Sequence, residues 1–258
     1  FSQNQQNEFA MPRQMLNDEQ WSKLRQIMLQ NGIYDKPCLR RTIEGILYRM
    51  RAGCPWRDLP RYFGKWNSVY KKFNYWSKNN KLIEIFKKLI TNPDLTIEFI
   101  DGTFIKAHQH SAGAAELGNQ DIGKSKGGNT TKIHMAVDGN GKPVKFCLSP
   151  GNINDSTMAK EIIGDLEATE FVVADKGYDS NDLRDLINNL GANAVIPRKI
   201  NSKIGNGSMD WTLYKLRHIV ENTFARLKHF RAIATRFDKL ARNYASMVAL
   251  ASGFLWVT

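Results

Sequence analysis

The hydrophobic period of this chain changes once, near residue 93, and that change constrains the fold more than any other feature. Before it, apolar residues recur every three or four positions, which is typical of amphipathic helices. After the breaker residues at 91–93, short runs rich in β-branched and aromatic residues alternate with turn residues, which is typical of strands. The sequence therefore predicts two domains: an all-α domain over residues 11–92 and an α/β domain over residues 93–258.

The order of the elements after residue 93 narrows the fold further. Four strand-like runs come first, LTIEFI, FIKAH, TKIHMAV and PVKFCLS, and the turn DGNGK between the last two is a hairpin signal. A helix near Ser156, a strand EFVVA, a helix capped by Ser180 and a strand AVI then alternate. Antiparallel strands followed by α/β units resemble the ribonuclease H arrangement, so we expect a mixed sheet with flanking helices. The polar, glycine-rich stretch 109–130 predicts an active-site loop.

The helical region carries a basic pattern that suits DNA. Asn17 is the expected cap of a first helix, and a second helix ends at Gly53. The polar side of this second helix is predicted to hold Arg40, Arg41, Arg49 and Arg51. After a break at Gly64, a Ser68-capped helix should turn Val69, Phe73 and Trp76 inward and Lys71, Lys72 and Lys78 outward. Helix, glycine turn and basic helix favour a helix-turn-helix that reads the major groove; the alternative is a helical bundle with a solvated lysine face.

The net charge, the apolar runs, the cysteines and the N-terminal residues indicate which partners and which cellular compartment suit this chain. The net charge of +12 favours a polyanionic partner, with nucleic acid as the leading candidate and a merely basic soluble protein as the alternative. No stretch approaches the roughly 20 apolar residues that span a bilayer, so we expect no membrane partner. The three cysteines lack metal-ligand spacing and fit a reducing cytoplasm. Residues 1–10 are expected to be disordered or foreign to the natural chain, with Met11 as its start.

Acidic residues in three places predict a divalent-metal site. Asp101 follows LTIEFI and Asp175 follows EFVVA, and α/β folds place catalytic groups at strand ends. Glu221 lies on a helical segment whose polar stripe also carries Tyr214, Arg217 and Lys228. Three converging carboxylates would suit Mg²⁺ or Mn²⁺, and two such ions can activate a water or a 3′-hydroxyl for attack at phosphorus. Singly, each aspartate has a plainer interpretation as turn chemistry, and Arg217 with Glu221 as a surface ion pair.

The segment GNQDIGKS formally matches a phosphate-binding loop but is rejected, because it lacks the preceding strand and the following helix. Lys124, Lys126 and Lys132 stand among glycines here, and we expect them to contact nucleic-acid phosphates; the alternative is a solvated loop. His134, inside a strand, is predicted to be a packed residue rather than a metal ligand.

Several blocks together resemble a known family. The tail YKLRHIVENTFARLK matches the Y-(2)-R-(3)-E-(6)-K signature of bacterial insertion-sequence transposases of the DDE class. DGTFIKAHQH, GKSKGGNTTKIH, PGNINDS and ADKGYDS look like their other blocks, and LNDEQW with YRMRAGCPWRDLPRYFGKWNSVYKKFNYWS resembles the helical DNA-binding region of the insertion-sequence-five type. The separation of Asp175 and Glu221 is short compared with relatives that carry a large β-rich insertion.

The resemblance implies a function and a site. Asp101, Asp175 and Glu221 would form the catalytic triad that holds two Mg²⁺ or Mn²⁺ ions, with Tyr214, Arg217 and Lys228 as accessory DNA-binding residues. Such an enzyme would act on double-stranded DNA at element ends and target, as a homodimer or higher oligomer, on the nucleoid in the bacterial cytoplasm. It would hydrolyse DNA and join 3′-hydroxyl ends to target DNA. The alternatives are a structure-selective nuclease of the same fold and an inactive DNA-binding regulator derived from a transposase.

Overall fold

Four helices form the N-terminal region of the computed structural model, which describes residues 12–111, 113, 118–163, 169–200 and 202–258. Residues 1–10 lie outside the described residues. The helices are α1 (Asp18–Gln30), α2 (Leu39–Ala52), α3 (Trp66–Lys78) and α4 (Lys81–Leu89), with 3₁₀ turns η1 (Trp56–Asp58) and η2 (Arg61–Phe63) between α2 and α3. Asn17 caps α1 in a capping box with Gln20, as the sequence predicts. Helix α3 begins at Trp66 after Lys65, so the prediction that Ser68 caps it is wrong.

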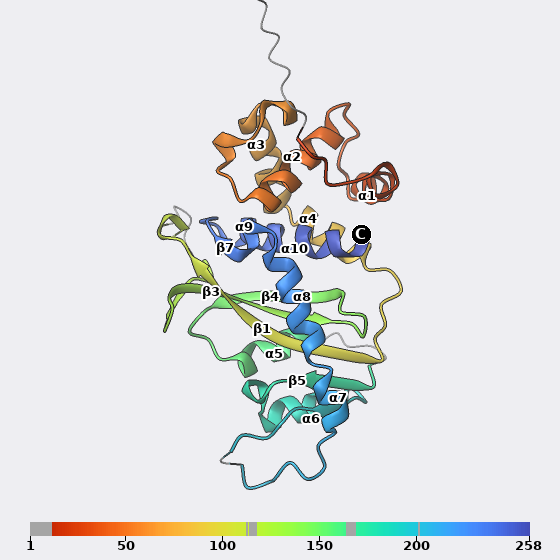
Figure 1. Cartoon of the computed structure of the whole chain (residues 1–258), viewed down its shortest axis with the longest axis vertical. Coiled ribbons are helices and arrows are strands. Elements are labelled where there is room, and N and C mark those ends of the chain that lie inside the picture. The colour runs from red at the N-terminus through yellow and green to blue at the C-terminus, as the bar shows by residue number, and fades with distance from the viewer. Residues whose placement is uncertain (1–11, 112, 114–117, 164–168, 201) are drawn as a thin grey trace, which may run out of the picture.

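A mixed sheet forms the second part of the molecule (Figure 1). Its strands are β1 (Ile97–Ala107), β2 (Gly123–Ser125), β3 (Gly128–Val137), β4 (Pro143–Pro150), β5 (Phe171–Ala174), β6 (Asn193–Val195) and β7 (Thr235–Arg236). Strands β1, β3 and β4 pair antiparallel, whereas β5 and β6 continue the sheet from β1 in parallel. The central order β4-β3-β1-β5-β6 is the predicted ribonuclease H arrangement.

Strand β1 differs from the sequence expectation, because LTIEFI and FIKAH form one strand of 11 residues. Asp101 therefore lies in the middle of β1 and not at its end. Asp101 nevertheless follows the point where the parallel pairing stops. Strand β5 pairs with β1 only as far as Ile100, whereas β3 still pairs with Asp101 and Gly102. The expected loop 109–130 also contains regular structure, namely the 3₁₀ turn η3 (Gln109–Ser111), β2 and the start of β3.

Helices cover both faces of the sheet. On one face lie α5 (Asp155–Ile163) and α6 (Asn181–Asn189), which bury Ile162 and Ile187 against Ile100 and Val172. The other face is crossed by α8 (His218–Lys228), which follows the short α7 (Trp211–Lys215) and runs over β1 in Figure 1. Because side chains alternate along β1, Asp101 and Thr103 face α8 while Gly102 faces α5.

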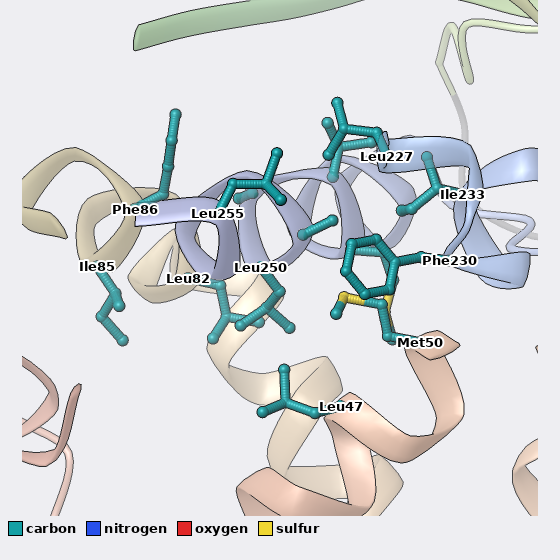
Figure 2. Packing of buried hydrophobic residues seen from close by; sticks show 14 of the residues in the cluster. Leu47, Met50, Leu82, Ile85, Phe86, Leu227, Phe230, Ile233, Leu250 and Leu255 are labelled. Carbon is teal, nitrogen blue, oxygen red and sulfur yellow. The ribbon is translucent and has the colours of Figure 1, made fainter. Parts of the chain in front are cut away.

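The C-terminal helix α10 (Ala241–Val257) joins the sheet to the helical region. It follows α9 (Arg231–Ala234) and β7 and packs beside α4, as Figure 1 shows. Figure 2 shows Leu250 of α10 beside Leu82, within a cluster that also contains Leu255, Leu47 and Phe230. One hydrophobic core therefore continues across residue 92. None of the helices in the described part of the chain is long and apolar enough to cross a membrane.

Candidate active site

Arg217 draws together two of the three predicted carboxylates. It lies in the turn between α7 and α8, one turn of helix before Glu221. Its guanidinium donates to Asp101 Oδ2 at 2.9 Å and to Glu221 Oε1 at 2.5 Å. The expected Arg217–Glu221 ion pair is therefore present, but Arg217 also joins α8 to the centre of β1. The Asp101 side chain is 17% exposed and that of Glu221 is 51% exposed, so the pair opens towards solvent on the Glu221 side.

Asp175 reaches the same site from the end of β5. Its Oδ1 accepts from the Gly177 amide at 2.7 Å and caps the 3₁₀ turn η4 (Lys176–Tyr178). Burial is the main cause that raises the pKa of Asp101 to about 6. The negative charges of Asp175 and Glu221 raise this pKa further, against the Gly102 amide and Arg217, which lower it. Both carboxylates are thus close enough to Asp101 to oppose its ionisation.

The carboxylates of Asp101, Asp175 and Glu221 are not arranged as a preformed metal-binding site. Within the described residues, no three His, Cys, Asp or Glu side chains are arranged as a ready cluster of metal ligands. Arg217 supplies the positive charge between Asp101 and Glu221 instead. The donor set consists of carboxylate oxygens with an excess of negative charge, which suits a hard cation such as Mg²⁺ or Mn²⁺. A cation held by Asp101 and Glu221 would replace the guanidinium as their partner.

The other two residues of the predicted stripe lie near Arg217 and β1 respectively: Tyr214 is beside Arg217, and Lys228 contacts β1. Lys228, at the end of α8, donates to Thr103 Oγ1 at 2.7 Å, and Thr103 lies two residues after Asp101 on the same face of the strand. The Tyr214 ring lies 5.9 Å from the Arg217 guanidinium carbon. Arg217, Glu221 and Lys228 therefore lie on the side of α8 that faces β1, as their spacing predicts, and Tyr214 of α7 lies beside Arg217.

Lys132 was expected to be accessible to DNA phosphates or solvent, but its side chain is buried. It is only 5% exposed and forms an ion pair with Asp155, the first residue of α5, while its ammonium lies 4.4 Å from the Phe104 ring centroid. The reason is strand alternation: Lys132 and His134 both point to the α5 face of β3. The prediction that Lys132 contacts DNA phosphates is therefore wrong.

His134 belongs to the same buried network. Its Nε2 lies 2.8 Å from Ser149 Oγ, and its Nδ1 lies 3.5 Å from both Tyr178 OH and Asp155 Oδ1. Burial lowers the pKa of His134 to about 4, so the ring is neutral at pH 7. The structure agrees with the expectation of a packed histidine.

Gly102 and Asp155 were not predicted as parts of the site. A methyl group on Gly102 would meet Lys132 Cε at 2.8 Å and Asp155 Oδ1 at 3.1 Å, so a larger residue there would displace these two side chains. The network thus lies directly behind the β1 backbone that carries Asp101. The sequence blocks DGT, NINDS and DKGYDS contained Gly102, Asp155 and Tyr178, but nothing in their spacing indicated that they meet.

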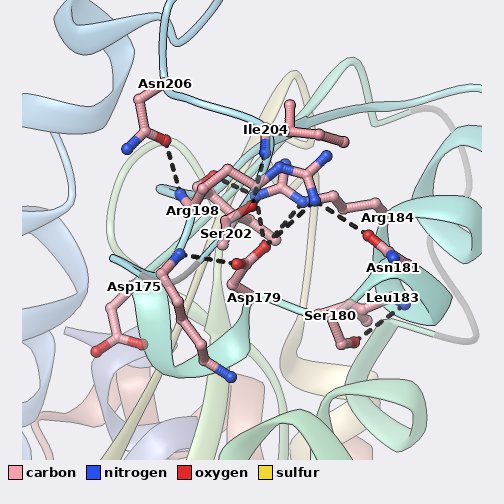
Figure 3. Close-up of polar contacts among 12 residues, drawn as sticks. Asp175, Asp179, Ser180, Asn181, Leu183, Arg184, Arg198, Ser202, Ile204 and Asn206 are labelled. Carbon is pink, nitrogen blue, oxygen red and sulfur yellow. Dashed lines mark hydrogen bonds and ion pairs between the residues drawn. The ribbon is translucent and has the colours of Figure 1, made fainter.

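A second set of polar contacts holds the segment after Asp175 (Figure 3). Asp179 accepts from Arg184 at 2.9 and 3.0 Å and from the Lys199 amide at 2.9 Å. Ser180 caps α6, as the sequence predicts, by accepting from the Leu183 amide. These bonds tie α6 and residue 199 to the turn that follows Asp175, and so restrain that carboxylate.

The other predicted DNA contacts divide into exposed and internal residues. Lys124, Lys126, Arg41 and Lys71 are exposed, and half-buried Arg40 pairs with Asp18 at 2.6 Å. Lys72 instead points between α2 and α3, where its ammonium donates to Thr42 Oγ1 at 3.0 Å. Arg49 is buried and pairs with Asp238 at 3.2 Å. The predicted solvent-facing positions of Lys72 and Arg49 are therefore wrong.

Comparison with known proteins identifies the family. Residues 92–254 match the family model described as a transposase DDE domain, and residues 16–86 match that of putative transposases of the IS4/5 family. The chain therefore belongs to the DDE transposase family. A putative transposase for insertion sequence element IS6501 of Brucella ovis is 37% identical over 130 residues, which are 50% of this chain and 98% of that protein.

Two further matches are more partial. A putative transposase for insertion sequence element IS402 of Burkholderia cepacia is 31% identical over 131 residues, 46% of this chain and 59% of that protein. Among solved structures, the pre-cleavage Mos1 transpososome covers 87% of this chain and 80% of that chain at 10% identity and a TM-score of 0.29. A superposition this loose defines no equivalent residues.

Proposed function

We propose that this chain cuts DNA at the ends of a mobile element and joins the resulting 3′-hydroxyl ends to target DNA. Asp101, Asp175 and Glu221 are the catalytic residues in this proposal, and they bind two Mg²⁺ or Mn²⁺ ions. The observation that carries it is the convergence of the three carboxylates: Asp175 and Glu221 both raise the pKa of Asp101, and Arg217 bridges Asp101 and Glu221.

The chemistry assigns different tasks to the residues. Bound metal ions would supply activation of the attacking water or 3′-hydroxyl and stabilisation of the leaving oxygen. Arg217, released from the carboxylates, would hold a phosphate of the scissile strand beside them. Lys228, on the same side of α8, would hold a second phosphate further along β1. The Lys132–Asp155 pair would keep the backbone of β1 and the start of α5 in register behind the site.

DNA binding extends this proposal to the rest of the chain. Exposed Arg41 and Lys71 of the helical region and Lys124 and Lys126 at the β2–β3 tip carry positive charge that suits duplex DNA. Together with Arg40 and Tyr214, they are the proposed contacts to the element ends. Action as a homodimer or higher oligomer, on the nucleoid of a bacterial cell, is part of the same proposal and follows from the family resemblance.

The test uses the full-length chain, Mg²⁺ and a plasmid that carries both sequences flanking the gene of this protein. Asp101→Asn, Asp175→Asn and Glu221→Gln should each abolish strand cleavage and leave DNA binding nearly intact, because each removes charge with little change in shape. Asp185→Asn, an exposed aspartate on α6, is the matched control. Cleavage by any of the three variants at the wild-type rate would falsify the triad assignment.

A labelled target plasmid separates the alternatives. The proposal requires joined products that link an element 3′ end to the target. Cleavage without joining would indicate a nuclease, and binding without cleavage would indicate a regulator.

A further inference from the structure

A large groove lies between the helical region and the segment that follows β7. Its volume is about 1120 Å³, and aromatic rings come to it from both sides. Trp56 of η1 with Trp66 and Tyr70 of α3 line one side, and Phe237 with His110 line the other. The volume exceeds the roughly 300–1,000 Å³ of typical small-molecule pockets, so the groove has room for an extended ligand.

The rings on both sides are held in place by their neighbours. The Phe237 side chain is 43% exposed and stacks on His108, with ring centroids 4.5 Å apart and an interplanar angle of 25°. On the opposite side, the Arg57 guanidinium lies 5.8 Å from the Trp66 ring, and Trp56 packs against Phe73 at 5.1 Å. An exposed ring supported from behind is a platform on which a flat ligand can stack.

The charge of the groove is positive. Exposed Arg57 and Lys239 line it, together with Arg49. Of the described residues that line the groove, Asp238 alone is acidic, and Arg49 pairs with its two oxygens at 3.2 and 3.4 Å. Both partners of that pair are buried, so the surface presented to a ligand combines aromatic faces with cations.

We infer that this groove binds unpaired nucleotides of a DNA strand. Aromatic platforms in a basic groove are the means by which proteins hold single strands, since every base offers a face for stacking and the cations follow the backbone. Duplex DNA does not fit this pattern, because its bases are already stacked on each other. The inference rests on the proposed action on DNA but assigns a site that the carboxylates do not need.

The groove lies within reach of the three carboxylates along β1. The His108 amide donates to the Arg236 carbonyl at 2.9 Å, which places the groove beside the end of β1. Asp101 lies seven residues earlier on β1, or about 23 Å at the usual rise of a strand. A DNA strand that extends from the carboxylates along β1 can therefore reach the groove. The groove is suited to hold DNA that is unpaired next to the cleavage point.

The test measures binding of a 15-nucleotide oligo-dT and of a 15-base-pair duplex to the full-length chain by fluorescence anisotropy. Phe237→Ala and Trp66→Ala should each weaken oligo-dT binding about tenfold, which is the scale of one base stacked on one ring. Phe237→Trp should retain it. Tyr34→Ala, which removes an 83% exposed ring outside the groove, is the matched control and should bind like wild type.

Equal oligo-dT affinity in wild type and in both alanine variants would overturn the inference. So would an equal loss of duplex binding, or a concentration-dependent dimer that disappears in Phe237→Ala, because the groove would then serve duplex DNA or a second copy of the chain. The two proposals fail separately. Wild-type cleavage with unchanged binding by the variants refutes only the groove, whereas ring-dependent oligo-dT binding without cleavage refutes only the proposed catalysis.

Discussion

Replacing Asp101 by Asn should make the metal-free protein more stable at neutral pH while it abolishes cleavage. The cause is the cost of ionising a buried carboxyl beside two others, which raises the pKa of Asp101 to about 6 from an ordinary value of 3.8. Between these two pH values the folded protein binds more protons than the unfolded chain, so stability falls as pH rises. The loss begins near pH 3.8 and is complete above pH 6.

The magnitude follows from the same two pKa values. At about 1.36 kcal/mol per pKa unit, ionised Asp101 lowers the free energy of unfolding by about 3 kcal/mol at pH 7. The effect at pH 5 is about half as large. This pKa already includes the favourable charge of Arg217, so the Asp101→Asn variant should recover most of the cost, and we expect a net gain of about 1 to 3 kcal/mol. For a chain of this size, that is a rise in Tm of about 2 to 8 °C.

Thermal unfolding in EDTA at pH 7.5, 6 and 5 tests the reasoning, with Asp185→Asn as the control. The gain should shrink as the pH falls from 6 to 5 and be absent from the control. Added Mg²⁺ should stabilise wild type more than the Asp101→Asn variant, because Asp101 is a proposed ligand. No gain at pH 7.5, or a gain that is the same at pH 7.5 and pH 5, would refute the argument.

Other variants probe the surroundings of the site. Lys132→Met should lower the free energy of unfolding in urea by about 2 to 3 kcal/mol, since it leaves Asp155 partly buried without its partner, and the added change Asp155→Asn should recover most of the loss; a loss below about 1 kcal/mol would contradict the role of this pair. Arg217→Ala and Lys228→Ala should each reduce cleavage about tenfold or more, a loss of at least roughly 1.4 kcal/mol in transition-state stabilisation. Only Arg217→Ala should also lower Tm in EDTA, because Arg217, unlike Lys228, neutralises two carboxylates. Wild-type cleavage rates in both variants would limit the catalytic assignment to the three carboxylates. Lys71→Ala should weaken duplex binding and reduce its salt dependence, whereas Lys72→Ala should act through stability; equal salt slopes in wild type and Lys71→Ala would exclude Lys71 as a phosphate contact.

Local signals in the sequence predicted most element boundaries. The Asn17 and Ser180 caps, the Gly53 stop and the DGNGK hairpin all depend on hydrogen bonds to the backbone within a few residues, and each forms as expected. The division of β1 into two strands was wrong because Asp101 and Gly102 read as turn residues. In the structure, pairing with β3 outweighs that local preference.

Side-chain roles were harder to predict, because they depend on residues distant in sequence. Lys132 and Lys72 looked like surface cations, yet each meets a partner that the fold supplies, Asp155 in one case and Thr42 in the other. The proximity of the carboxylates to Arg217 was predictable, since a family motif records their spacing, while their catalytic role stays a prediction. The network behind Gly102 was not, because contacts across a sheet leave no periodic signal in one sequence.

Asp101→Asn should stabilise the metal-free protein and Arg217→Ala should destabilise it. Both effects follow from the charges at the site. Three carboxylates share a region with one bridging guanidinium, so the cluster holds more negative charge than Arg217 can neutralise. A fold selected for stability alone would remove one carboxylate there. Retaining all three favours the binding of cations, and a cation that replaces Arg217 frees its guanidinium for a phosphate. The strain of the metal-free site and its capacity for catalysis thus have the same electrostatic origin.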